Sequence, residues 1–409
     1  MQHLTDWLIN TKYFRECPSE IGCFYHYKKH IPLLKKGSYN SITVLFAHYS
    51  YDAPFDTDTD VFSSIKPFYL DMLRQRKCIF ILDGTHEGWA PEHQSVAIAL
   101  YNSAIKNNID PSAIFFLSGN LREKANFKNF HITHGDYYPI NIIEIMHWDT
   151  FQKVMMTEGK RRFSRRQSLE QNYQGKFYLN LTRRNRFWRS YCTWRLHEAG
   201  VAQYGLLSHD RLNPKEYKAN KFFTKEMEQT LTRVTPLIAD TTDFETNWAD
   251  DLGVGLQNQV LFNLTSETMQ SDWGETSLFY SEKTFKPIVC KTPVLIWGQT
   301  GQNYNLQRLG YKLYTDWFDY EFDFEPDIVK RWNKLEKEIV RVCTMLSKMT
   351  RSQQIDWSLK NEDLLDYNYK FADYNDYTIS EFLRLIESAQ NYLGNQLIND
   401  PTYPSKNTM

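Results

Sequence analysis

The feature that most constrains the fold is an alternation of short apolar strands with amphipathic helices that starts twice along the chain. In the first half, apolar runs at 41–50, 78–82 and 113–117 are predicted strands. Helical patterns at 61–76 and 96–105 separate them, with apolar residues every three or four positions. Strands that alternate with helices over short links form parallel sheets covered by helices. We therefore predict an α/β lobe for the first half.

A second alternation begins near residue 175, after a polar and basic stretch. It has the order strand, helix, strand, followed by two further strands with a helix between them. The corresponding ranges are 176–181, 187–199, 204–208, 259–264, 282–289 and 293–297. Two amphipathic helices, at 328–349 and 379–393, are expected near the end of the chain.

Two successive α/β series predict a two-lobed protein whose site lies in a deep cleft between the lobes. We expect an N-terminal lobe over 1–165, a C-terminal lobe over 176–350, and a helical segment over 351–409 that packs back on the first lobe. Ligands of open α/β sheets bind at the carboxyl ends of the strands. The loops that directly follow strands are therefore the places to look for chemistry.

Composition and local patterns narrow the class of protein. With 409 residues and 42% hydrophobic content, the chain can form two buried cores, which excludes a disordered or fibrous protein. It has no apolar stretch near the ~20 residues of a membrane span and no signal-peptide pattern, so we expect cytoplasmic localisation. Asp56, Asp58 and Asp60 resemble a calcium loop, but Val61 and Pro67 stand where glycine and glutamate are needed. We therefore predict no metal site.

Titratable side chains gather on the loop that follows the predicted strand at 78–82. This loop reads Asp83-Gly-Thr-His86-Glu87-Gly-Trp89. Its glycines allow the backbone to approach a ligand closely, and its carboxylates and imidazole are suited to general base catalysis. Glu87 is the leading candidate for the base, with His86 and Asp83 as rivals. The alternative interpretation is that the two carboxylates only cap the following helix.

Positive charge is concentrated between residues 160 and 195. The chain has 48 Lys and Arg against 49 Asp and Glu, yet this segment holds eleven basic residues against Glu170 alone, a net +10 that leaves −11 for the rest. The basic residues are Lys160, Arg161, Arg162, Arg165, Arg166, Lys176, Arg183, Arg184, Arg186, Arg189 and Arg195. Arg183, Arg184 and Arg186 follow a strand and precede a helix, an arrangement that binds phosphate. For the rest of the segment a solvated surface is the alternative.

The most specific pattern is Tyr280-Ser-Glu-Lys-Thr-Phe-Lys-Pro287, which the apolar run Pro293-Val-Leu-Ile-Trp-Gly298 follows. Ser281 is expected to cap a helix whose first turn contains Glu282 and Lys283. A lysine in the first turn opposes the helix dipole unless an anion is bound nearby. This conflict predicts a bound phosphate.

The same pattern resembles the donor-binding signature of the α1,3-fucosyltransferase-like glycosyltransferases, especially the stand-alone members of bacteria and bacteriophages. Asn180-Leu-Thr-Arg-Arg-Asn-Arg186 and Asn263-Leu-Thr-Ser-Glu-Thr268 resemble earlier motifs of the same group. The resemblance covers residues 176–345. It implies a GT-B architecture, in which two Rossmann-like lobes bind a sugar nucleotide on the C-terminal side and the acceptor on the N-terminal side.

Carried over by position, the resemblance implies that Glu282 hydrogen-bonds the donor ribose and that Lys283 pairs with the diphosphate. One of the arginines at 183–186 would supply a second phosphate contact. Ser281 and Lys286 complete the predicted donor site. No cofactor is implied, because the sugar nucleotide is itself a substrate.

Together these residues predict a glycosyltransferase that moves a sugar from a nucleotide-diphosphate sugar to an acceptor hydroxyl, with inversion and without a metal. Glu87 would take the acceptor proton, and the cations would stabilise the departing diphosphate. Lys286 and Pro287 differ from the pair usual in fucosyltransferases, which leaves the donated sugar open.

The acceptor has two candidates, a glycan or DNA with hydroxymethylated bases in a phage-infected cell. The basic segment at 160–195 would suit DNA through contacts to phosphates. The main alternative function is a non-catalytic nucleic-acid-binding protein on a Rossmann-like scaffold. A kinase is a weaker alternative, because no phosphate-binding glycine motif occurs in a strand-to-helix turn.

Overall fold

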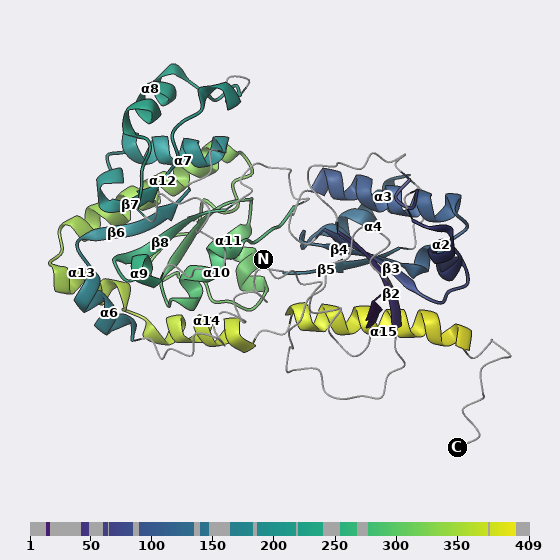
Figure 1. Cartoon of the computed structure of the whole chain (residues 1–409). Helices are drawn as coiled ribbons and strands as arrows, with labels where there is room; N and C mark the ends of the chain where they lie inside the picture. The colour runs from purple at the N-terminus through teal and green to yellow at the C-terminus, as the bar shows by residue number, and fades with distance from the viewer. Residues whose placement is uncertain are drawn as a thin grey trace. The chain divides into compact units, whose positions relative to one another are not determined.

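The computed structural model forms two compact α/β units (Figure 1). Unit 1 comprises Met1–His147, Thr276–Phe279 and Asp376–Met409, and unit 2 comprises Trp148–Glu275 and Tyr280–Asn375. The structure describes residues 14–16, 42–48, 60–63, 65–84, 90–134, 140–146, 164–182, 186–217, 220–239, 254–267, 277–374 and 377–397. No described helix combines the length and the apolar character needed to cross a membrane.

Unit 1 contains a five-stranded parallel sheet whose strands follow one another in chain order. Its strands are β1 (Phe14–Glu16), β2 (Ile42–His48), β3 (Ile79–Gly84), β4 (Ile114–Ser118) and β5 (Asn141–Glu144). Its helices are α2 (Pro67–Arg74), α3 (Ala90–Lys106), the 3-10 helix η2 (Pro111–Ala113), α4 (Glu123–His134) and α15 (Tyr377–Leu397). The predicted strands at 41–50, 78–82 and 113–117 are confirmed as β2, β3 and β4.

The strand order of unit 1 explains which helices cover which face. Each strand pairs with the next strand in the chain, so every connection crosses the sheet in the same direction. Right-handed connections of this kind place their helices on one face of the sheet. Helices α3 and α4 cover that face, whereas α15, from the end of the chain, packs against β2 and β5 on the opposite face (Figure 1). Each residue of β4 is buried, as expected for a parallel strand between two helical layers.

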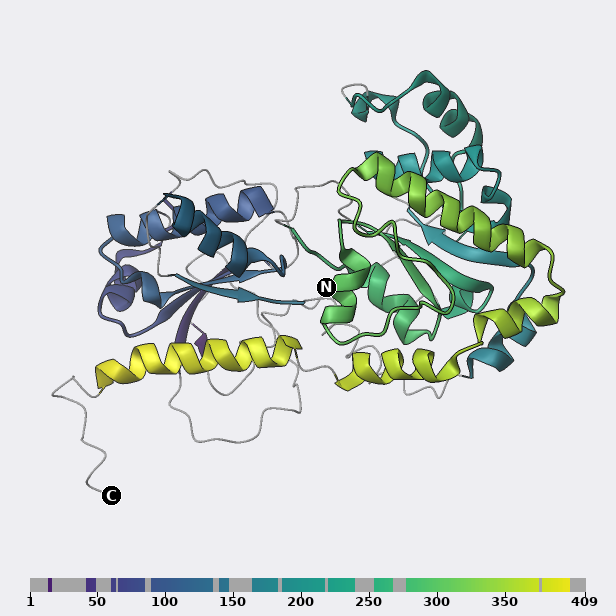
Figure 2. The same ribbon diagram turned by 180° about the vertical axis from the view of Figure 1, so that it is seen from behind.

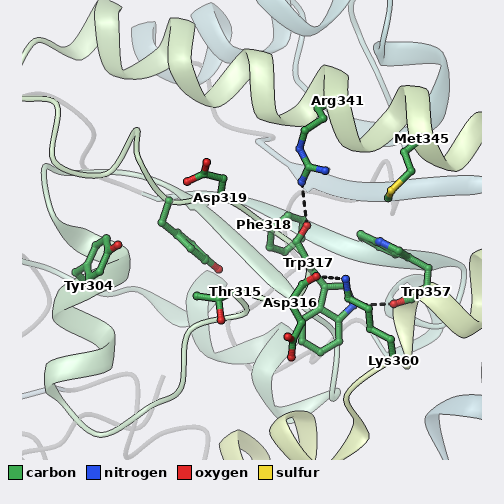
Figure 3. A pocket seen from close by; sticks show the side chains of 11 residues that line it. Tyr304, Thr315, Asp316, Trp317, Phe318, Asp319, Arg341, Met345, Trp357 and Lys360 are labelled. Atoms are coloured by element: carbon green, nitrogen blue, oxygen red, sulfur yellow. Dashed lines mark hydrogen bonds between the residues drawn. The ribbon is translucent and has the colours of Figure 1, made fainter.

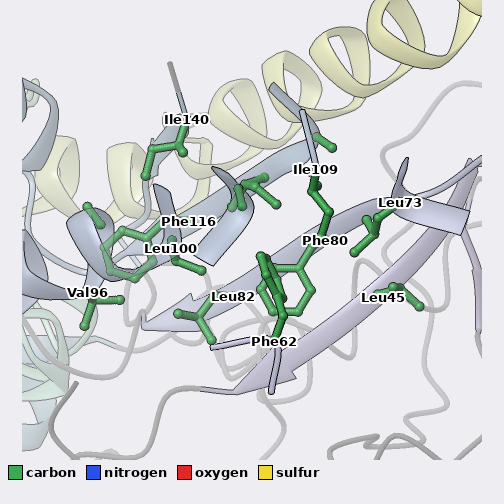
Figure 4. Packing of buried hydrophobic residues seen from close by; sticks show 14 of the residues in the cluster. Leu45, Phe62, Leu73, Phe80, Leu82, Val96, Leu100, Ile109, Phe116 and Ile140 are labelled. Carbon is green, nitrogen blue, oxygen red and sulfur yellow. The ribbon is translucent and has the colours of Figure 1, made fainter. Parts of the chain in front are cut away.

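The core of unit 1 is built around the aromatic residues of β3 and β4 (Figure 4). Phe80 of β3 meets Phe62 edge to face, with ring centroids 5.1 Å apart. Leu45 of β2 and Phe116 of β4 extend the cluster on either side of Phe80. Tyr392 of α15 packs against the same cluster, so the last helix of the chain contributes to the core of the first unit.

Unit 2 contains a four-stranded parallel sheet of order β7-β6-β8-β9. Its strands are β6 (Lys176–Leu181), β7 (Gly205–Ser208), β8 (Val260–Ser266) and β9 (Val294–Trp297). Its α-helices are α6 (Arg165–Asn172), α7 (Phe187–Glu198), α8 (Lys225–Val234), α9 (Val254–Gln257), α10 (Glu282–Val289), α11 (Gln302–Arg308), α12 (Ile328–Ser347), α13 (Arg351–Ser358) and α14 (Glu362–Tyr374). All four strands were predicted from the sequence.

Helix α12 is the long helix predicted at 328–349, and its apolar stripe faces the core of unit 2. Trp332 lies edge-on to Trp297 of β9, with ring centroids 5.0 Å apart. Figure 2 shows α12 as the long yellow-green helix in front of the sheet. A buried stripe along its whole length explains the regular spacing of its apolar residues in the sequence.

The predicted C-terminal segment at 351–409 is divided between the two units. Helix α15 belongs to unit 1, whereas α13 packs on α6 and β8, and α14 packs on α10, within unit 2. An ion pair of 2.5 Å between Lys291 and Asp366 holds α14 near the end of α10. Unit 2 therefore extends to residue 375, beyond the expected end of its lobe at 350.

Candidate functional site

The strand order of unit 2 marks the edge where a ligand is expected. Strand β6 lies between β7 and β8. The chain therefore passes from β6 to β7 on one side and then crosses to β8 on the other side of β6. In open α/β sheets such a reversal leaves a crevice at the carboxyl ends of the two strands, which is where ligands bind. Here β6 runs into Thr182 and the arginine loop, and β8 runs into Glu267.

Glu267 links the end of β8 to the start of α10, and its side chain is fully buried. Its carboxylate accepts hydrogen bonds from the Ser281 N–H at 3.2 Å, from Ser281 Oγ at 2.6 Å and from Thr284 Oγ1 at 2.5 Å. A carboxylate that accepts bonds at a helix N-terminus is further stabilised by the helix dipole. Glu267 therefore fixes the position of the first turn of α10. The sequence assigned it no role, because its partners are 14 and 17 residues away.

Glu282 and Lys283 form an ion pair in the first turn of α10. Lys283 Nζ lies 2.5 Å from the Glu282 carboxylate, and the two side chains are 26% and 17% exposed. Ser281 caps the helix, as predicted, by accepting a bond from the Lys283 N–H. Burial favours a raised pKa for Glu282, but Lys283 and Lys286 outweigh it and lower the pKa to about 2. The conflict between Lys283 and the helix dipole is thus offset within the chain by Glu282.

The lowered pKa of Glu282 predicts a dependence of stability on pH. A carboxyl whose pKa falls on folding, here from about 4.5 to about 2, stabilises the fold above pH 4.5 and loses that contribution as pH falls towards 2. We expect Glu282→Gln to remove up to about 3 kcal/mol at pH 7. The difference in melting temperature between this variant and the parent should shrink between pH 5 and pH 3. A difference that stays constant with pH would contradict the ion pair.

The start of the arginine loop is tied to the sheet of unit 2. Asn180 of β6 is buried, and its amide donates to Leu264 O at 2.6 Å and to Ser266 Oγ at 3.0 Å. Thr182 Oγ1 donates to the carbonyl of Ser208 in β7 at 2.9 Å. These bonds hold β6 between its two neighbours and fix the point where the loop leaves the sheet.

The arginines of this loop are only partly described. Arg186 is the N-cap residue of α7 and is half-buried. The basic residues that lie outside the described parts of the chain are Lys160, Arg161, Arg162, Arg183 and Arg184. The prediction that Arg183 or Arg184 contacts phosphate therefore stays a prediction.

Three of the described basic residues of the 160–195 segment, Arg165, Arg166 and Arg195, bind groups of the chain itself at separate places. Arg165 is buried, where its pKa is lowered to about 10, and it donates to two backbone carbonyls at 2.5 and 2.6 Å beside the start of β8. Arg166 and Arg195 pair with Asp356 and Glu336, at 2.9 and 2.8 Å. These three residues are bound within the chain, and the prediction of a nucleic-acid surface for the whole segment stays a prediction, because five of its eleven basic residues lie outside the described residues.

In unit 1, the first two residues of the predicted catalytic loop belong to β3 itself. Asp83 and Gly84 are the last residues of β3, at the carboxyl end of the sheet. A Cβ atom at Gly84 would approach the Phe116 ring to 2.9 Å, so close packing against β4 requires glycine here. His86 and Glu87 lie outside the described residues, and their roles stay predictions.

A buried carboxylate, that of Glu144, lies at the carboxyl edge of the unit 1 sheet. Glu144, the last residue of β5, accepts a hydrogen bond of 2.8 Å from the Lys124 N–H at the start of α4. Burial raises the pKa of Glu144, and the nearby carboxylates of Glu381 and Glu123 add to this effect. Glu144 thus caps α4 much as Glu267 caps α10. The sequence did not indicate it, because Glu144 lies within an apolar run.

No protein-family model matches the chain, and no curated protein is similar to it in sequence. The chemistry of the site therefore follows from its geometry. A helix N-terminus that carries a lysine and a low-pKa carboxylate, at the reversal point of a parallel sheet, is suited to a ligand with phosphate and hydroxyl groups.

Proposed function

We propose that the chain is a glycosyltransferase of GT-B architecture that binds a nucleotide-diphosphate sugar at the start of α10. The observation that carries the proposal is the Ser281-Glu282-Lys283 sequence at the N-terminus of α10, which Glu267 holds beside the carboxyl end of β8. When the donor binds, the ammonium group of Lys283 would leave the Glu282 carboxylate and pair with the diphosphate. The carboxylate of Glu282 would then accept hydrogen bonds from the ribose hydroxyls.

The proposal assigns the acceptor and the general base to unit 1. Glu87 is the leading base, with His86 and Asp83 as the rival groups on the same loop. The base takes the proton of the acceptor hydroxyl while its oxygen attacks the anomeric carbon of the donor. The bond from that carbon to the diphosphate breaks, and the cations of unit 2 stabilise the departing anion. A single displacement of this kind inverts the anomeric carbon and needs no cofactor.

A glycan is favoured over DNA as the acceptor. Arg165, Arg166 and Arg195 were expected to contribute to a basic surface, but they bind groups of the chain itself. The same contacts reduce the support for a non-catalytic nucleic-acid-binding protein. Weak binding to duplex DNA, without the steep salt dependence of many phosphate contacts, is the outcome we expect.

A thermal-shift screen against a panel of sugar nucleotides tests the proposed function. A ligand that binds only the folded protein stabilises it by about 2.7 kcal/mol at a concentration of 100 times its Kd. We expect one nucleotide class to raise the melting temperature of the parent chain in a concentration-dependent manner. If no sugar nucleotide or free nucleoside diphosphate shifts the transition, the donor site is not at α10.

A further inference from the structure

A pocket of about 420 Å3 opens in unit 2 (Figure 3) near the amino ends of β8 and β9, whereas α10 starts at the carboxyl end of β8. Two of its lining residues, Phe318 and Trp357, contact Phe262 near the start of β8, with ring centroids 5.3 and 6.0 Å apart. Tyr320 Oη donates to the carbonyl of Val294, the first residue of β9. The length of β8 separates this edge from Glu267 by roughly 20 Å. A ligand here is therefore distinct from the proposed donor.

The aromatic wall of the pocket is held in place by hydrogen bonds and packing. Trp317 is 2% exposed, and its indole N–H donates to the carbonyl of Trp357 at 2.8 Å. Lys360 Nζ lies 5.6 Å from the Trp317 ring and 5.7 Å from the Trp357 ring. Arg341 and Met345, one turn apart on α12, line the pocket from the other side (Figure 3). The pocket is thus preformed.

The cations of the lining are bound within the chain, whereas two of its carboxylates are exposed. Arg341 binds the carboxylate of Glu338 at 2.5 and 2.7 Å, and Lys360 donates to the carbonyl of Asp316. The carboxylates of Asp316 and Asp319 are exposed at the pocket. An anion would meet these two carboxylates, whereas the hydroxyl groups of a ligand could donate hydrogen bonds to them. The lining therefore favours a ligand with many hydroxyl groups and no negative charge.

We propose that this pocket is a saccharide-binding site. Its volume lies within the range of about 300 to 1,000 Å3 that is usual for small-molecule sites. Most of the lining aromatic rings are buried, with Trp317 and Trp357 2% and 7% exposed, so Tyr304, which is partly exposed, offers the apolar surface for the C–H face of a sugar ring. Asp319 and Thr315 at the rim accept hydrogen bonds from sugar hydroxyls. The inference does not depend on the proposed function; in a glycosyltransferase, the pocket would hold a remote sugar of a glycan.

Ligand-observed NMR and tryptophan fluorescence with methyl glycosides of neutral hexoses and N-acetylhexosamines test this site, together with neutral oligosaccharides. We expect saturable binding by the parent chain, weakened about tenfold or more in Tyr304→Ala and Asp319→Ala. The matched control is Tyr204→Ala, because Tyr204 is a partly exposed tyrosine of unit 2 that stacks on Phe177 outside the pocket.

The variant Lys283→Ala separates this inference from the proposed function. It should bind the saccharide like the parent chain even though it loses its response to sugar nucleotides. The inference is overturned if no saccharide gives a saturable signal, or if the signal survives unchanged in both pocket variants. Saccharide binding that disappears in Lys283→Ala would also overturn it, because the sugar would then be bound at α10.

Discussion

Replacement of Lys283 by alanine is expected to weaken donor binding by about a hundredfold and to lower transfer in proportion. The lysine sits in the first turn of α10, where it is 26% exposed and near enough to Glu282 to be held in place without a ligand. A hydrogen bond to a charged group contributes about 1.5–3 kcal/mol, which corresponds to a tenfold to 150-fold change in Kd. Isothermal titration with the nucleotide found by thermal-shift screening measures the change directly.

Two controls separate lost donor contact from a damaged fold. Lys337→Ala removes an exposed lysine of α12 in the same unit and should leave donor affinity unchanged. Lys283→Ala also leaves the low-pKa carboxylate of Glu282 without its partner, which lowers stability. The double variant with Glu282→Gln relieves that charge and should recover part of the melting temperature without recovering donor affinity. Near-normal donor affinity in Lys283→Ala would remove Lys283 from the donor site.

The regular elements were predictable because their signals are local. The all-apolar β4 and the periodic helix α12 each carry enough apolar residues to identify them from the sequence. The short strands β1 and β5 were missed, because three or four residues are too few to show the two-residue alternation of a strand. Their strand conformation depends on pairing with neighbouring strands of the sheet. Within the predicted helical segment at 351–409, α13 and α14 were not identified as separate helices, because part of their buried face consists of polar side chains such as Gln354 and Asn368.

The candidate site was predictable only where adjacent residues act together. Ser281, Glu282 and Lys283 are consecutive, so a cap and an ion pair in one helical turn follow from their spacing. A count of charges cannot show where each one is bound. Arg165 reaches carbonyls 92 and 95 residues further along the chain. Arg165 is therefore not part of an exposed basic surface, which the number of charges in the segment could not show.

Glu267→Gln is expected to lower both the stability of unit 2 and the affinity for the donor, although Glu267 is too deeply buried to contact a ligand. Both of its oxygens accept hydrogen bonds, from the N–H and hydroxyl of Ser281 and from the hydroxyl of Thr284. A glutamine turns one acceptor into a donor, so an N–H group would face another donor in a buried place. An unsatisfied buried donor costs about 1–3 kcal/mol. We expect a loss of that size in chemical denaturation.

The donor affinity of Glu267→Gln identifies it as a positioning residue rather than a purely structural one. We expect a drop of about tenfold, because α10 would no longer be held where Lys283 meets the diphosphate. Thr284→Val removes one of the partners and should show part of the same effect, and the two changes should be less than additive in the double variant. Glu321→Gln, at an exposed glutamate of unit 2, is the matched control. If Glu267→Gln lost stability but kept parental donor affinity, the first turn of α10 would not be the donor site.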